Sequence, residues 1–235
     1  DPFLVAALGS AMVEGLQGSR DGTIAPGHVA ATLKHFVGYG NTEGGRNRSP
    51  YQHGRRQLLD TDVYPFQKII RQSKPASVMA AFNEIDGLPC HVNPWVLNDV
   101  LRKRIGFKGL IIGDYQGIDL VRKYQRIGNS DADAARMALQ SGLQLELPNN
   151  FGFKHLPKLI EEKKVDVVLI DKAVRSVLAL KFRLGLFEAP MQLDGQKAKA
   201  LIKSKSATEL AREAARQSIV LLKNDVGLLP IKKGQ

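Results

Sequence analysis

The chain contains 235 residues, of which 34 are Lys or Arg and 23 are Asp or Glu, so its formal net charge is +11. Hydrophobic residues make up 43% and charged residues 24%, which excludes a disordered or fibrous chain and predicts a globular fold. The length suits one large domain, or one domain with part of a second, because α/β barrels reach ~250 residues as a single unit.

Hydrophobic periodicity predicts helices and strands that alternate along the chain. In order they are helix 1–17, strand 28–37, helix 58–72, strand 76–82, helix 93–105, strand 109–112, helix 131–141, strand 143–147, helix 154–163 and helix 166–184. A glycine-rich loop at 38–51 follows the first strand, and loops of this length inside a domain usually carry function. The short connections require parallel strands, so we predict an α/β fold with a buried parallel sheet, either doubly wound or closed as a barrel.

The character of the sequence changes after Gly185. Residues 187–205 are predicted to be a linker, 207–216 a helix and 217–223 a strand, which indicates a second domain that is cut as it begins. The first residues show neither an initiating Met nor a secretion signal, so we expect a mature or partial chain. Localisation is left unknown, with a periplasmic or secreted location favoured.

The excess positive charge does not predict a nucleic-acid partner. Basic residues occur in small groups spread along the chain, and aromatic residues, which would stack on bases, make up only 6%. We interpret these groups as solvated helix faces. No apolar run approaches the ~20 residues that cross a bilayer, so no membrane partner is predicted either.

No cofactor or metal is predicted. Cys90 is the only cysteine, which excludes an intramolecular disulfide and a thiolate zinc cluster, and the five histidines lack the spacing of metal ligands. The glycines of the 38–45 stretch have a weak similarity to a dinucleotide-binding loop. No helical pattern follows them, so this interpretation is disfavoured.

Polar residues follow the apolar run of four successive predicted strands. They are Lys34 with His35, Asn83 with Glu84, Asp114 with Tyr115, and Glu146. Reactive groups in parallel α/β folds collect at these strand ends. Asp114 lies in the sequence GDYQG, whose glycines leave room for a ligand and whose tyrosine lies beside the carboxylate. This pairing suits a sugar, with the carboxylate attacking the anomeric carbon while Lys34 and His35 bond hydroxyl groups.

A retaining glycosidase needs a second carboxyl group ~5 to 5.5 Å from the first. Glu84, Asp86 and Glu146 are the candidates, and no spacing singles one of them out. Taken alone, Asp114 also fits a helix cap or a turn residue, because these are common roles for an Asp after a strand.

Several stretches in collinear order carry a family resemblance. They are 34–40 (KHFVGYG), 78–83 (VMAAFN), 113–115 (GDY), 181–187 (KFRLGLF) and 218–224 (SIVLLKN). With these motifs the chain resembles glycoside hydrolase family 3, the family of β-glucosidases and β-xylosidases. The resemblance covers nearly the whole chain.

The resemblance implies the later part of a (β/α)8-like barrel at residues 1–186, a linker at 187–205, and the opening helix and strand of an α/β sandwich domain at 206–235. The first barrel strands of the family have no counterpart here. The acid/base Glu of the glucosidase branch belongs to the second domain, so none of the three acidic candidates is assigned that role. We expect at most slow activity from this chain alone.

The resemblance also implies a retaining, two-step mechanism with Asp114 as the nucleophile. Sugar contacts are implied for Lys34, His35, Tyr115, Arg46 and Phe82. Gly113 replaces a usual Ser, Phe82 replaces a common Tyr, and Tyr115 stands where another aromatic ring is often found. These departures leave the sugar preference open.

The sequence therefore predicts a retaining, exo-acting β-glucosidase or β-xylosidase that hydrolyses terminal β-linked sugars of oligosaccharides or glycosides. One alternative is a sugar-binding or interaction module that keeps the fold without the acid/base. Another is a β-N-acetylglucosaminidase of the same family, although the loop at 38–43 (GYGNTE) lacks the Gly-His-Gly pattern of that branch. The expected partners are the glycoside substrate and either the missing parts of the same protein or further copies of the chain.

Overall fold

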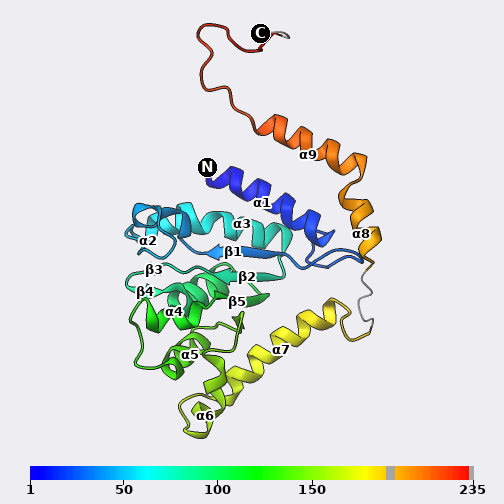
Figure 1. The fold of residues 1–235 in the computed structure, drawn as a ribbon. Coiled ribbons are helices and arrows are strands. Elements are labelled where there is room, and N and C mark those ends of the chain that lie inside the picture. Colours follow the sequence, from blue (N-terminus) through cyan, green and yellow to red (C-terminus); the bar gives the residue numbers. More distant parts are fainter. Residues whose placement is uncertain (189–193, 233–235) are drawn as a thin grey trace. The chain divides into compact units, whose positions relative to one another are not determined.

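The computed structural model describes residues 1–188 and 194–232 (Figure 1). The chain forms two compact units, residues 1–189 and 190–235. Residues 189–193, which fall in the predicted linker, and residues 233–235, at the end of the predicted second domain, lie outside the described residues.

The first helix confirms the prediction for residues 1–17. Helix α1 spans Pro2–Gln17, and the carboxylate of Asp1 caps it by accepting the backbone N–H of Phe3 at 2.7 Å. Gly18 ends the helix with a φ of 73°, in the left-handed region that favours glycine. Figure 1 shows α1 beside α3 (Tyr64–Ser73), and the two helices share a small apolar cluster with β1.

Four parallel strands confirm the predicted buried sheet. They are β1 (Thr32–Phe36), β2 (Ser77–Ala80), β5 (Leu110–Tyr115) and β6 (Leu145–Leu147), in the spatial order β1-β2-β5-β6. The predicted strand at 28–37 began too early, because only residues 32–36 join the ladder with β2. The predicted stop at Gly113 was also wrong, because β5 continues to Tyr115, which pairs with Leu147 of β6.

Helical segments connect these strands, as predicted. They are α2 (Arg55–Gln57), the π-helical η3 (Leu58–Val63) and α3 before β2, the π-helical η5 (Trp95–Arg104) before β5, and α4 (Gly117–Lys123) and α5 (Asp131–Gln140) before β6. After β6 come η6 (Phe153–His155), α6 (Leu156–Glu161) and α7 (Val167–Arg183). Helix α4 was not predicted.

A small antiparallel hairpin was also not predicted. It pairs β3 (Glu84–Ile85) with β4 (Leu88–Pro89), and the 3-10 turn η4 (Cys90–Val92) follows it. Asp86 and Gly87 turn the chain with φ values of 52° and 73°. An Asp-Gly pair is a strong signal for this kind of tight hairpin, so the sequence did contain the information.

The two faces of the sheet are both buried. Val78, Ala80 and Ile111 belong to the main core, together with residues of η5, α5 and α6. Side chains alternate along a strand, so their neighbours Met79, Leu110 and Ile112 lie on the other face, where they meet α7. The sheet is therefore fixed from both sides, which gives the strand ends a rigid base.

The unit after residue 190 contains α8 (Gly195–Ile202), which lies within the predicted linker, and α9 (Lys205–Ser218). The predicted strand at 217–223 is not observed: α9 runs through Ser218, and residues 219–223 have no ladder partner in the described ranges. Apolar, β-branched residues cannot form a strand where no neighbouring strand accepts their backbone hydrogen bonds. Over the described ranges, the helices are too short or too polar to cross a membrane.

Candidate active site

Two strands of the sheet carry a bulge where they end. β1 pairs Leu33 with Val78 and then Phe36 with Ala80, so β1 holds an extra residue around Lys34 and His35. β5 shows the same shift against β6 between Ile112 and Tyr115, around Gly113 and Asp114. Bulges are frequent next to active sites because they re-aim side chains, and here each bulge coincides with residues predicted from the sequence.

The bulges bring His35 and Asp114 together. The His35 Nε2 atom lies 3.3 Å from the Asp114 Oδ2 atom, and the two side chains are 25% and 14% exposed. Burial lowers the pKa of His35 below its ordinary value, the charge of Asp114 partly opposes this, and the charge of Lys34 adds to it. A mostly neutral imidazole therefore faces a partly buried carboxylate.

Asp114 is also held through its backbone. Its Oδ1 atom accepts the N–H of Tyr115 at 2.7 Å, and its own N–H donates to the Nε2 atom of His91 at 2.9 Å. His91 is 1% exposed, and burial lowers its pKa to about 4, so the ring is neutral near pH 7. His91 was not predicted as a site residue, because the spacing of the histidines was informative only for metal binding.

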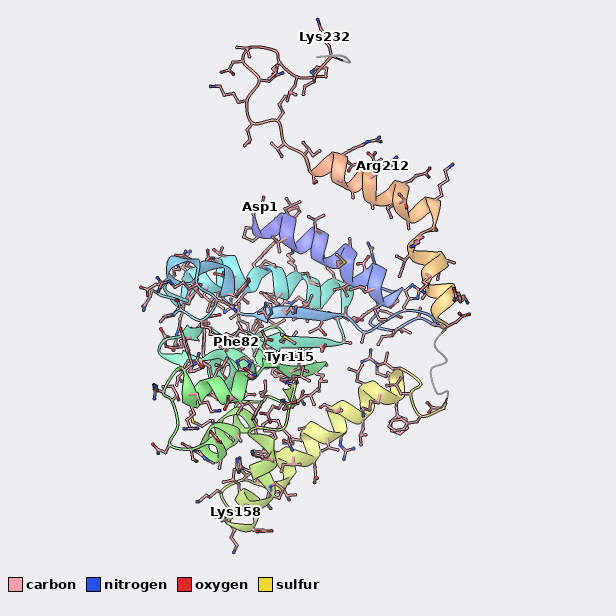
Figure 2. The ribbon with its side chains drawn as sticks, in the orientation of Figure 1. Asp1, Phe82, Tyr115, Lys158, Arg212 and Lys232 are labelled. Atoms are coloured by element: carbon pink, nitrogen blue, oxygen red, sulfur yellow. The ribbon has the colours of Figure 1, made fainter. Side chains whose placement is uncertain are left out.

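Two predicted aromatic residues lie beside this arrangement. The ring of Phe82 stacks on His91 with a centroid distance of 5.8 Å. Tyr115 is 60% exposed at the end of β5, where its ring is free to meet a ligand. Figure 2 labels both residues near the middle of the first unit.

Lys34 and Arg46 are exposed, and neither makes a hydrogen bond or ion pair with Asp114 in the part of the chain that the structure describes. Lys34 lines a groove of about 610 Å³ between α1, β1 and α3. Arg46 lies in the 38–51 loop, where its carbonyl oxygen accepts the Thr42 hydroxyl at 2.8 Å. The structure thus brings His35 to Asp114 but leaves these two cations at the periphery.

The 38–51 loop is tied to the rest of the molecule by Asp62. Its carboxylate accepts the Tyr51 hydroxyl at 2.9 Å and the Asn41 amide at 2.7 Å. The Arg48 guanidinium lies over the rings of Phe82 and Tyr124, 5.4 and 5.5 Å from their centroids. The predicted functional loop therefore reaches Phe82, which stacks on His91.

The three acidic candidates for a second catalytic carboxyl are placed differently. Glu146 accepts the N–H groups of Gly152 and Phe153 at 2.9 and 2.8 Å, so it organises the loop after β6. Asp86 pairs with Arg55 at 3.0 Å. Burial raises the pKa of Glu84, which adjoins the hairpin turn. No contact marks any of them as the partner of Asp114.

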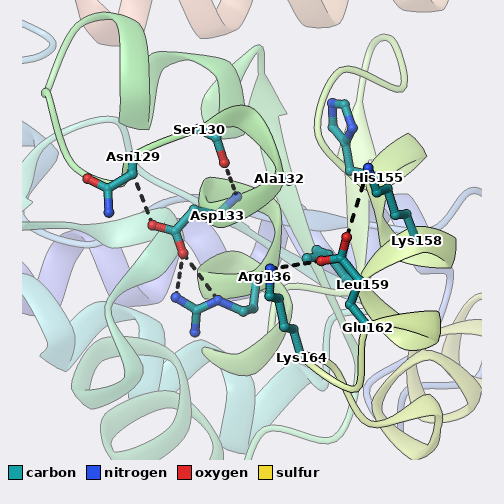
Figure 3. A pocket seen from close by; sticks show the side chains of 10 residues that line it. All are labelled: Asn129, Ser130, Ala132, Asp133, Arg136, His155, Lys158, Leu159, Glu162 and Lys164. Carbon is teal, nitrogen blue, oxygen red and sulfur yellow. Dashed lines mark hydrogen bonds and ion pairs between the residues drawn. The ribbon is translucent and has the colours of Figure 1, made fainter.

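A separate pocket of about 510 Å³ lies between α5 and α6 (Figure 3). Its charged residues largely neutralise one another: Arg136 pairs with Asp133, and Glu162 lies near both Lys158 and Lys164. It shares no residue with the Asp114 site. Over residues 1–188 and 194–232, no group of three or more His, Cys, Asp or Glu side chains could hold a metal ion.

Known proteins match this chain over nearly its whole length. Residues 1–180 match the glycosyl hydrolase family 3 N-terminal domain. A β-xylosidase from Formosa agariphila is 33% identical over 239 residues, covering 98% of this chain and 33% of that protein.

Solved structures show the same fold. A β-glucosidase from Erythrobacter marinus superposes with a TM-score of 0.93 at 36% identity, covering 99% of this chain and 31% of that chain. A β-glucosidase from Listeria innocua in complex with glucose gives a TM-score of 0.90 at 35% identity, covering 98% and 32%. The chain thus spans about a third of the length of each of these relatives.

Proposed function

The chain belongs to glycosyl hydrolase family 3, and from this we propose that it supplies the nucleophile and part of the sugar site of a retaining, exo-acting β-glycosidase. The observation that supports the proposal best is the geometry of Asp114. Its carboxylate lies at the bulged end of a central strand, 3.3 Å from His35, with Oδ1 bonded to the Tyr115 N–H. A nucleophilic carboxylate needs this fixed, partly desolvated position.

In the proposed reaction, Asp114 attacks the anomeric carbon of a terminal β-linked sugar. A C–O bond forms to the carboxylate, the bond to the leaving group breaks, and the departing oxygen takes a proton from an acid/base carboxyl. Water, deprotonated by that same group, then releases the sugar with retained configuration. We assign the acid/base to a group outside residues 1–188, in keeping with the contacts of Glu146 and Asp86.

The remaining predicted residues would surround the sugar. Tyr115 and Phe82 would pack against its ring, and His35, Lys34 and Arg46 would bond its hydroxyl groups. A terminal β-glucose or β-xylose is the proposed substrate, in line with the names of the relatives, a β-xylosidase and β-glucosidases, one of them solved with glucose.

We further propose that the four-stranded sheet forms part of a (β/α)8 barrel. Two features support this: the strands are all parallel, and β1 and β6 each pair on only one side within the described residues. Residues 206–235 would then contribute to a second α/β domain, in which the exposed apolar run after α9 finds its strand partner.

The test is covalent trapping on the protein as it is encoded in full. A 2-fluoro β-glucoside with a good leaving group should accumulate as an ester, and peptide mapping by mass spectrometry should place the label on Asp114. A label on any other residue would refute the assignment. Asp86→Asn is a matched control, because that carboxylate pairs with Arg55 and should not affect labelling.

A second candidate function is sugar binding without hydrolysis. The observation that favours it is that Glu146 and Asp86 are already engaged, so no acid/base is assigned within the described residues of the first unit. An activated aryl glycoside separates the two, because its leaving group needs no protonation. Release of the phenol with glycosyl azide formed on adding azide supports a nucleophile, whereas binding without release supports a sugar-binding module.

A further inference from the structure

We propose that His91 is a positioning residue for Asp114, and that Gly117 is the residue that makes room for it. The inference rests on the proposed nucleophilic role of Asp114. In this proposal, the buried imidazole of His91 fixes the bulge of β5 from which the Asp114 carboxylate projects.

The bulge creates the need for this contact. An extra residue between Ile112 and Tyr115 shifts β5 out of step with β6, and such a shift leaves backbone groups without ladder partners. The N–H of Asp114 donates instead to the His91 Nε2 atom at 2.9 Å. Without this acceptor, a partly buried N–H would be unsatisfied, and the bulge would relax to find another partner.

The position of the His91 ring is strongly constrained. The residue lies in the η4 turn after the β3–β4 hairpin, is 1% exposed, and is covered by the ring of Phe82. Because Nε2 accepts a hydrogen bond, the neutral ring must carry its proton on Nδ1. The ring therefore has one orientation and one tautomer in which it serves Asp114.

Gly117 explains how the ring comes so close. A Cβ atom at this position would lie 2.1 Å from the His91 Nε2 atom, which no real contact allows. Its φ is not in the left-handed region, so the backbone alone does not require glycine. Glycine is needed at 117 because it has no side chain. Any larger residue there would push the His91 ring away from the Asp114 N–H.

Gly113 provides a matched comparison. A Cβ there would meet the Leu143 side chain at 3.4 Å and the His91 Cδ2 atom at 3.5 Å, which are ordinary contacts. Both glycines flank Asp114 and both face the His91 ring, yet only the one at 117 is incompatible with a side chain.

The experiment measures kcat and KM for an activated aryl β-glycoside on the protein as it is encoded in full. His91→Leu should lower kcat by about 10²-fold with little change in KM, because misplacing the attacking atom affects the transition state more than ground-state binding. His91→Gln, which offers an amide oxygen in place of Nε2, should recover most of that loss. Gly117→Ala should lower kcat about as much as His91→Leu does. The loss of kcat in Gly113→Ala should be smaller than that in Gly117→Ala by a factor of about ten or more.

Several results would overturn the proposal. A folded His91→Leu protein with kcat close to wild type excludes a positioning role, as does an equal effect of the two glycine substitutions. If His91→Leu does not fold, as judged by circular dichroism, kcat of His91→Gln is compared with kcat of Gly117→Ala. A kcat in His91→Gln no higher than that in Gly117→Ala would then overturn the proposal. Trapping of the wild-type label on a residue other than Asp114 would instead refute the proposed function.

A second readout does not depend on turnover. In protein labelled with ¹⁵N at His and Asp, a coupling across the hydrogen bond should link the Asp114 amide nitrogen to the His91 Nε2 atom. The His91 resonances should report the Nδ1–H tautomer. Gly117→Ala should abolish the coupling, and Gly113→Ala should preserve it. Absence of the coupling in the wild-type protein would exclude the contact.

Discussion

β1 and β5 both end in a bulge, but the two ends are built differently. β5 lies between β2 and β6, and the backbone and carboxylate of Asp114 are each hydrogen-bonded. β1 pairs only with β2 within the described residues, and Lys34 on it is exposed. The end of β5 is therefore organised for fixed geometry, and the end of β1 for adaptable contact. The first should govern kcat and stability, and the second should govern KM.

The largest expected effect is at β5. Asp114→Asn should reduce kcat by ~10³-fold or more, about 4 kcal/mol, because an amide cannot form the glycosyl ester. The measurement is steady-state hydrolysis of an aryl β-glucoside by the protein as encoded in full. Asp86→Asn should leave kcat within about twofold. An equal loss of kcat in Asp114→Asn and Asp86→Asn would show that the carboxylate of Asp114 has no special role in the reaction.

The second largest effect is a loss of folding stability in acid, caused by His91, which contacts the end of β5. The pKa of His91 falls from its ordinary 6.5 to about 4 in the folded protein, because burial outweighs the attraction of Asp114. Between these values the unfolded chain binds a proton that the folded chain does not, so stability decreases as pH falls from 6.5 to 4. At about 1.4 kcal/mol per pKa unit, the loss is roughly 3 kcal/mol.

Denaturant unfolding across this pH range checks the prediction. His35, whose pKa is also lowered, contributes in the same direction. His91→Gln removes one titrating group and should therefore flatten the curve without removing the acceptor for Asp114. An unchanged pH dependence in this variant would contradict a buried neutral His91.

At the β1 end, Lys34→Gln should raise KM about tenfold, equivalent to ~1.4 kcal/mol, with a much smaller change in kcat. The side chain is exposed, so the melting temperature should stay close to wild type. Lys108→Gln, at another exposed lysine, should change neither quantity. A loss in kcat without a rise in KM would show that the β1 end is not merely a binding surface.

The smallest effect concerns the loop that follows β1. Asp62→Asn replaces an acceptor of two hydrogen bonds, from Tyr51 and Asn41, and should cost about 1 kcal/mol of unfolding free energy. Limited proteolysis should then cut the 38–51 loop faster. Asp60→Asn is the control, because that exposed carboxylate pairs with Arg56, at 3.5 Å, and makes no other ion pair within the described residues. Equal protease sensitivity of both variants would show that Asp62 does not anchor the loop.

The sequence predicted the parallel sheet and the meeting of His35 with Asp114, because strand periodicity and the rule that strand ends converge are both local properties. It missed His91, which arrives from a turn after a hairpin. No periodic pattern places that turn beneath β5. The sequence marked Gly117 as leaving room for a ligand, but the space beside it is filled by the ring of His91, a residue distant in sequence.

The strand predicted at 217–223 is not observed for a different reason. The run Ile219 to Leu222 has strong β-propensity, but strand formation depends on a partner rather than on composition. The end of β5 was misplaced for a related reason. Gly113 and Asp114 read as a turn signal, whereas the bulge allows both to stay within the strand.

The close approach of Gly117 to His91 also constrains how this sequence can change over time. A mutation that adds a side chain at 117 while the ring is present meets a clash, so the ring must first give way to a smaller residue. In the reverse direction, residue 117 must become glycine before a histidine can be introduced at 91. Two positions 26 apart in the chain should therefore evolve as a dependent pair, and the route between their two states passes through only one of the two possible intermediates.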